Sequence, residues 1–243
     1  MTPQAIAEAL QQVLGPRLKS VVLYGSAASG DYVQGRSDFN VLIVADPLGL
    51  DELTAIAGPA RAWSRAGNRA PLLFGPGQLA ASVDAFPIEL FDICRSRTLL
   101  LGEDPLVGVA VPIEPLRLQL EREWKGKLLN LRERAVLCRG KPRRLAALMT
   151  ATVNSMLVLM RATLRLHQED VPAAKLDALT ALAAHVPFET DPFLRSHSVR
   201  IGETRWKGLD VPVLFTKYLQ SVERLVEAVD RRGPQFSGPA NRD

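Results

Sequence analysis

The apolar pattern of this 243-residue chain changes at LLLGEDPLVGVAVPIEPL (residues 99–116), a segment with three prolines and two glycines. Before it, short β-rich runs alternate with segments of helical spacing, which is typical of an α/β or α+β sheet domain. After it, Leu, Ala, Arg and Glu recur at helical spacing only. We therefore expect an α+β fold with a mixed sheet and flanking helices over residues 1–112 and a helical bundle over 113–232. The Gly/Pro-rich tail 233–243 is expected to be disordered.

Individual elements follow from caps and periodicity. Thr2, Pro3 and Gly15 are typical start and stop residues of a first helix. Helix 51–66 is expected to break or kink at Gly58-Pro59. Expected strands lie at 18–25, 38–46, 71–74 and 86–94, and expected bundle helices at 116–138, 143–168, 171–186 and 210–232. Between the last two helices, the connection 193–210 is polar and carries Trp206 beside Lys207; a lid or an acceptor-binding loop is the minor alternative for it, and an ordinary bundle connection is the main one.

The stretch YGSAASGDYVQGRSDFNVLIV (24–44) carries the chemistry. Gly25-Ser26 follows a strand and opens a short helix, an arrangement that favours a phosphate. Strand alternation places Asp38 and Asn40 on one face, with Phe39 and Val41 on the other. With Glu89 from the expected strand 86–94, these oxygens are suited to Mg²⁺ and triphosphate. Asp92 is the competing third acid, and strand parity allows only one of the two to face the site.

GSAASGDYVQGRSDFN (25–40) resembles the Gly-Ser and Ser-Asp-x-Asp signature of the DNA polymerase beta-like nucleotidyltransferase superfamily. The resemblance covers roughly residues 18–104. FPIELFDICRSRTLLLGEDPL (86–106) resembles the segment with the third acid, and the helical half is similar to the all-α domain of bacterial aminoglycoside nucleotidyltransferases and small stand-alone relatives. The resemblance implies Mg-dependent transfer of a nucleoside monophosphate from an NTP such as ATP to a hydroxyl acceptor.

The same resemblance assigns roles. Gly25 and Ser26 hold the terminal phosphates, Asp38 is a metal ligand, and Glu89 is a ligand or the base that takes the acceptor's proton. Arg36 and Ser37, directly before Asp38, are placed to touch phosphate. Asn40 stands where the family has its second metal-binding aspartate, so the expected metal set is Asp38, Asn40 and Glu89.

Two hypotheses about function depend on the effect of an asparagine at position 40. An amide cannot bridge two metal ions as a carboxylate does, and losing one charge at ligand distance costs roughly several kcal/mol. About 4 kcal/mol corresponds to roughly a thousandfold in rate. The chain is therefore either a weakened nucleotidyltransferase or a catalytically impaired nucleotide-binding or regulatory module, a pseudoenzyme of the same fold.

Composition limits the partners. The net charge of +4 mildly favours anions, but acidic residues are mixed in throughout, so nucleic acid is not an expected partner. The basic cluster Arg132 to Arg144 reads as a solvated helix–helix turn rather than a polyanion patch. More basic than acidic residues lie along the first two bundle helices, which argues against a polycationic acceptor. Two separated cysteines, the lack of a signal peptide and the lack of a long apolar run predict a cytoplasmic protein without a membrane partner.

Overall fold

The computed structural model describes residues 1–30, 32, 35 and 37–232. Arg36 and the tail 233–243 lie outside the described residues. Internal contacts divide the chain into two compact units, Met1–Pro112 and Ile113–Asp243.

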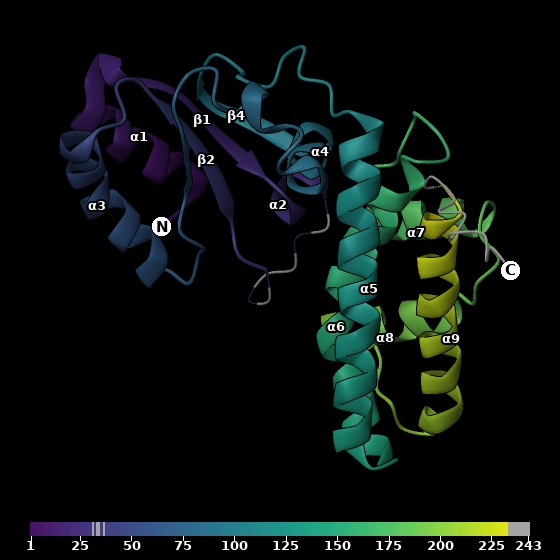
Figure 1. The fold of residues 1–243 in the computed structure, drawn as a ribbon. Helices are drawn as coiled ribbons and strands as arrows, with labels where there is room; N and C mark the ends of the chain where they lie inside the picture. The colour runs from purple at the N-terminus through teal and green to yellow at the C-terminus, as the bar shows by residue number, and fades with distance from the viewer. Residues whose placement is uncertain (31, 33–34, 36, 233–243) are drawn as a thin grey trace, which may run out of the picture. The chain divides into compact units, whose positions relative to one another are not determined.

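In the described part of the first unit, four strands form one sheet: β1 (Leu18–Tyr24), β2 (Asn40–Ala45), β3 (Leu72–Phe74) and β4 (Arg97–Gly102). The order is β3-β2-β1-β4. β1 runs antiparallel to both β2 and β4, whereas β2 and β3 are parallel. The predicted mixed sheet is confirmed (Figure 1).

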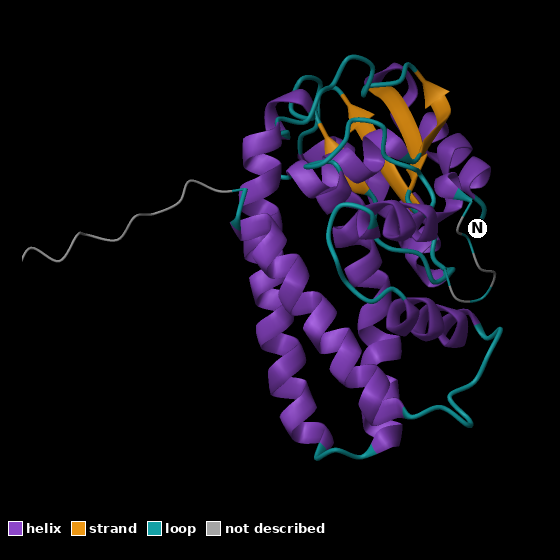
Figure 2. Ribbon diagram, turned by 90° about the vertical axis from the view of Figure 1, so that its right-hand side faces the viewer, coloured by secondary structure: helices purple, strands orange, loops and turns teal. Residues whose placement is uncertain are grey.

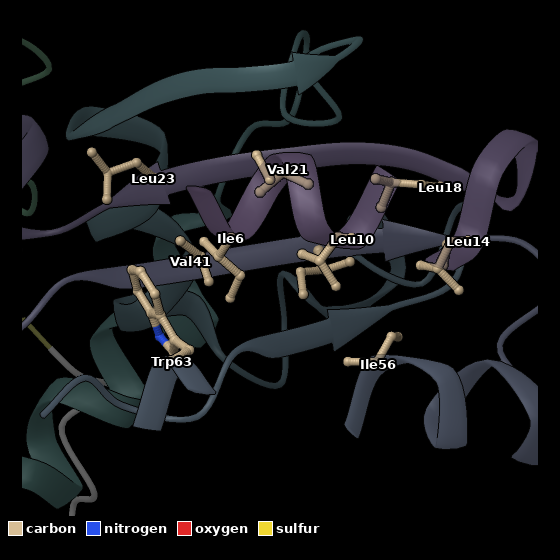
Figure 3. Packing of buried hydrophobic residues seen from close by; sticks show 12 residues of the cluster. Ile6, Leu10, Leu14, Leu18, Val21, Leu23, Val41, Ile56 and Trp63 are labelled. Atoms are coloured by element: carbon tan, nitrogen blue, oxygen red, sulfur yellow. The ribbon is translucent and has the colours of Figure 1, made fainter. Parts of the chain in front are cut away.

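One face of the sheet is covered by α1 (Pro3–Leu14) and α3 (Leu50–Arg65). The Thr2 hydroxyl accepts a hydrogen bond from the Ala5 N–H at 3.2 Å, so the predicted N-cap is present. Figure 3 shows the resulting core, in which side chains from both helices meet those of β1 and β2. α3 continues through Pro59 without a break, and Ile56 and Trp63, seven residues apart on either side of it, are both buried in the core.

The opposite face packs against α4 (Pro87–Arg95). This second cluster joins Val22, Leu42, Val44, Leu90, Ile93 and Leu106. Three short elements complete the unit: the 3-10 turns η1 (Gly15–Arg17) and η2 (Ala80–Ser82), and the single-turn helix α2 (Ser26–Ser29).

The second unit is helical within its described residues: α5 (Ile113–Cys138), α6 (Pro142–Leu164), α7 (Lys175–Ala183), α8 (Asp191–Ile201) and α9 (Val211–Asp230). α6 packs against each of the other four helices. Buried hydrogen bonds supplement this packing, because the Trp124 indole donates to the Thr163 hydroxyl at 2.8 Å and Thr152 bonds Tyr218 at 3.1 Å. The predicted helical bundle is confirmed, and Figure 2 shows its helices in purple.

Two details differ from expectation. The connection 193–210 is not an irregular segment throughout, because Asp191–Ile201 forms α8 with the buried Phe193 facing the core. Of the described helices, α6 is long and apolar enough to cross a membrane by length and composition, although 67% of its most apolar stretch is buried inside the protein. α6 is thus the central core helix of this unit.

Candidate functional site

The candidate site begins where β1 ends. Tyr24 is the last residue of β1, and Gly25 follows with φ +78°, a left-handed backbone conformation that favours glycine. The Gly25 N–H donates to the Ser96 carbonyl at 3.1 Å, and its own carbonyl accepts from Ala28 and Ser29 as α2 forms. Since the first N–H groups of a helix have no partner within it, Ser26 lies at a turn that presents donors.

The two halves of the motif meet at Gly25 and Asn40. Tyr24 and Asn40 are direct partners across the antiparallel β1–β2 ladder. A Cβ atom added to Gly25 would lie 3.3 Å from Asn40 Nδ2, so only a hydrogen fits comfortably between that backbone and the amide. Residues 15 positions apart are therefore held in contact by the strand register.

The expected facing of the strand is confirmed for two residues. Phe39 and Val41 pack into the core under α1 and α3, and Phe39 lies 6.2 Å from Trp63 between ring centroids. Alternation places Asn40 on the other face, the side to which Leu42, Val44 and α4 belong. Asp38 lies two residues before β2 begins at Asn40 and is partly exposed.

Asp38 forms an ion pair with Arg69, whose Nε lies 3.1 Å from Asp38 Oδ2. The turn after α3 holds both partners. Asn68 Oδ1 accepts from the Phe39 N–H at 3.0 Å, and the Trp63 indole donates to the Arg69 carbonyl at 2.8 Å. The side chain of Arg69 is 78% exposed and that of Asp38 is 37% exposed, so this pair adds little to stability but sets the charge beside the motif.

Tyr24 connects this pair to α4. Burial raises the pKa of Tyr24 to about 12; the positive charge of Arg69 opposes the rise, and the carboxylates of Asp38 and Asp92 add to it. The phenol is therefore a neutral hydroxyl at physiological pH. Asp38, Arg69 and Asp92 are thus near enough to Tyr24 for their charges to shift its pKa.

The predicted strand over residues 86–94 is wrong, since Pro87–Arg95 forms α4. Residues three apart in a helix share a side, so the strand-parity argument separating Glu89 from Asp92 does not apply. Glu89 is exposed on α4, whereas Asp92 is partly buried and acts electrostatically on Tyr24.

The remaining predicted residues lie close in sequence to this group. Ser37 is partly exposed directly before Asp38, and Ser26 opens α2 after Gly25. Arg36 lies outside the described residues. Within the described residues, no three His, Cys, Asp or Glu side chains are grouped so that they could hold a metal ion.

No family model and no curated protein sequence matches this chain. Among solved structures, the chain is similar to the crystal structure of spectinomycin adenyltransferase AAD(9) from Enterococcus faecialis with ATP and spectinomycin. The TM-score is 0.56 and the identity 17%, over 91% of this chain and 98% of the other. The chain has a nucleotidyltransferase-like fold.

Sequence reasoning did not single out Tyr24, which pairs with Asn40 across the sheet, or Arg69, which forms an ion pair with Asp38. The sequence did indicate Tyr24. It directly precedes the motif glycine, and strand alternation puts its side chain on the face opposite to that of Leu23, which is the motif side of the sheet. Arg69 was not indicated in this way, since it reaches Asp38 only through the fold of the α3–β3 turn.

Proposed function

We propose that the chain transfers a nucleoside monophosphate from an NTP to a hydroxyl group of a small-molecule acceptor, slowly because of Asn40. The observation that supports this most is the contact between Gly25 and Asn40 beside Asp38, which joins both halves of the motif. The fold adds support, because it is shared with an adenyltransferase whose crystal structure contains ATP.

In this proposal Gly25 and Ser26 hold the terminal phosphates, with Ser37 and Arg36 beside them. The acceptor oxygen attacks the α-phosphorus, the bond to the β-phosphate oxygen breaks, and pyrophosphate leaves. The acceptor's proton passes to a carboxylate. We assign that role to Asp92 in preference to Glu89, because Asp92 and Asp38 both act on the Tyr24 phenol.

The donors present suit one nucleotide-bound Mg²⁺ rather than a bridged pair. Mg²⁺ is usually held by one or two carboxylates together with substrate phosphates, and in this proposal its protein ligands are Asp38 and the amide oxygen of Asn40, two residues apart at the start of β2. An amide does not bridge two ions. When bound, Mg²⁺ would neutralise charge on the phosphates. To bind the metal ion, Asp38 would have to give up its ion pair with Arg69.

A second candidate is a nucleotide-binding module without efficient transfer. The observation that favours it is that Asp38 already has a cationic partner, Arg69, while residue 40 is a neutral amide. In that case the guanidinium offers the phosphates a positive charge without a metal ion.

Calorimetric titration with each NTP, with and without Mg²⁺, separates the candidates when combined with pyrophosphate release. The transferase proposal expects Asn40→Asp to raise both Mg²⁺-dependent affinity and turnover. Asn130→Asp, which adds the same charge at an exposed position of α5, serves as the matched control. If nucleotide binds but neither protein releases pyrophosphate or modifies an acceptor, the binding module is the correct description. Absence of nucleotide binding would contradict both.

A further inference from the structure

The second unit contains a pocket of about 740 Å³ that none of the proposed transfer residues touches. It is formed by the first half of α6, the end of α8 and the connection from α8 to α9. Its size falls in the range of small-molecule sites, which is roughly 300–1,000 Å³. Its lining includes Trp206 and Lys207, the neighbouring aromatic and basic residues noted in the sequence.

Small side chains create the hollow. Ala146, Ala147 and Ala151 line it from adjacent positions on α6, where larger residues would fill the space. Trp206 lines it from the α8–α9 connection. The Trp206 indole N–H donates to the Thr150 hydroxyl at 3.1 Å, which fixes the ring against α6. The pocket therefore has an apolar base and one anchored aromatic wall.

The lining carries charge of one sign. Arg143, Arg200 and Lys207 contribute three cationic side chains, and among the described lining residues none is acidic. Asp210 is near in sequence but serves as the N-cap of α9, where it accepts from the Val213 N–H at 3.2 Å. Like charges around a low-dielectric hollow concentrate a positive potential in it.

We propose that this pocket binds a small amphipathic carboxylate, with its apolar body against the alanines and Trp206 and its carboxylate among the three cations. A neutral apolar molecule would gain no attraction from Arg143 and Lys207, and a polycation would be repelled. Its lining residues are different from those of the proposed nucleotide site, and its occupancy does not depend on transfer activity.

Decanoate is a suitable probe, followed by tryptophan fluorescence of the full chain. Trp63 and Trp124 are fully buried, whereas Trp206 is partly exposed in the pocket, so Trp206 dominates a local response. We expect a saturable change with decanoate, at least tenfold weaker binding of decanol, and weakening of the decanoate signal by salt. Equal affinity for decanoate and decanol, or no saturable response, would overturn the proposal.

Variants test the location. Ala147→Phe should fill the hollow and weaken decanoate binding at least tenfold, whereas Ala184→Phe, at an exposed alanine after α7, should not. Arg143 and Lys207 are exposed, so the double variant Arg143→Gln/Lys207→Gln should fold normally and lose most of the preference for decanoate over decanol. Unchanged binding in the double variant would contradict the assignment even if Ala147→Phe failed to fold.

Discussion

At the scale of single residues, His167 shows how packing selects a protonation state. Its Nδ1 lies 3.0 Å from the Arg232 guanidinium and must accept that hydrogen bond, and its ring stacks on His185 with centroids 5.2 Å apart. Burial, then the positive charge of Arg232, then His185 lower the pKa of His167 to about 4. His167 is therefore neutral in the folded protein at pH values where an unfolded histidine is charged.

This difference predicts an acid-sensitive stability. Between pH 6.5 and about 4, the unfolded chain binds a proton at His167 that the folded chain does not. The free energy of unfolding therefore decreases as the pH falls through this window. Above pH 6.5 His167 makes no pH-dependent contribution. His167→Gln should flatten the fall in melting temperature between pH 7.5 and pH 5 measured by thermal unfolding. Parallel pH profiles for the two proteins would show that His167 does not titrate in this way.

Gly102 is a second residue whose replacement has a predictable cost. Its φ is +79°, and an added Cβ would lie 1.9 Å from the Lys19 carbonyl oxygen across the β1–β4 ladder. Gly208 has nearly the same φ, +81°, but open space around it. We expect Gly208→Ala to cost about 1–2 kcal/mol for the backbone conformation alone. Gly102→Ala should cost roughly 1–3 kcal/mol more, from the clash. Equal losses in denaturant unfolding would refute the steric argument.

At the scale of elements, periodicity predicted β1, β2, β3 and most helices. It missed β4, part of which falls in the expected domain junction, and it gave the wrong element where two periods fit the same residues. In Pro87–Arg95 the apolar residues Ile88, Leu90, Phe91 and Ile93 suit either a strand or a helix, and Pro87 at the first helical position was the signal for α4. For α8 the signals were Pro192 near the start and Gly202 at the end, with only a short apolar stripe between them. Because this segment is mostly polar, the α8 helix was not predicted from the sequence.

The helical form of α4 yields a prediction about the third acid. Asp92 and Glu89 share a side of the helix, but Asp92 is the one that acts on Tyr24 together with Asp38. Asp92→Asn should therefore reduce pyrophosphate release by roughly a hundredfold, the scale of losing a general base. Glu89→Gln, matched in charge change, should stay within about threefold. A larger loss in Glu89→Gln would restore the sequence-based assignment.

At the scale of the whole molecule, the sequence predicted the mixed sheet and the bundle because the change of apolar pattern reports local structure. It did not predict the charges beside Asp38. Arg69 is 31 positions away, and its contact depends on how the α3–β3 turn packs against Phe39 and Trp63. The motif residues could be identified from the resemblance to a superfamily, whereas the charged partner of Asp38 could be identified only from the tertiary structure.

The position of the boundary between the units can be tested with fragments. Leu106 is 2% exposed and belongs to the cluster of Val22, Leu42 and Leu90, so the segment after β4 is part of the sheet unit's core. Burying a leucine contributes about 1.5–3 kcal/mol, a large share of a small domain's stability.

We therefore expect residues 1–112, expressed alone, to unfold cooperatively in denaturant, whereas residues 1–102, which end with β4 but lack Leu106, should unfold at a clearly lower midpoint. Far-UV circular dichroism of both fragments gives the comparison, and residues 113–232 alone should remain helical. Equal midpoints for the two sheet fragments would place the boundary at the end of β4, because the segment carrying Leu106 would then contribute nothing to the first unit.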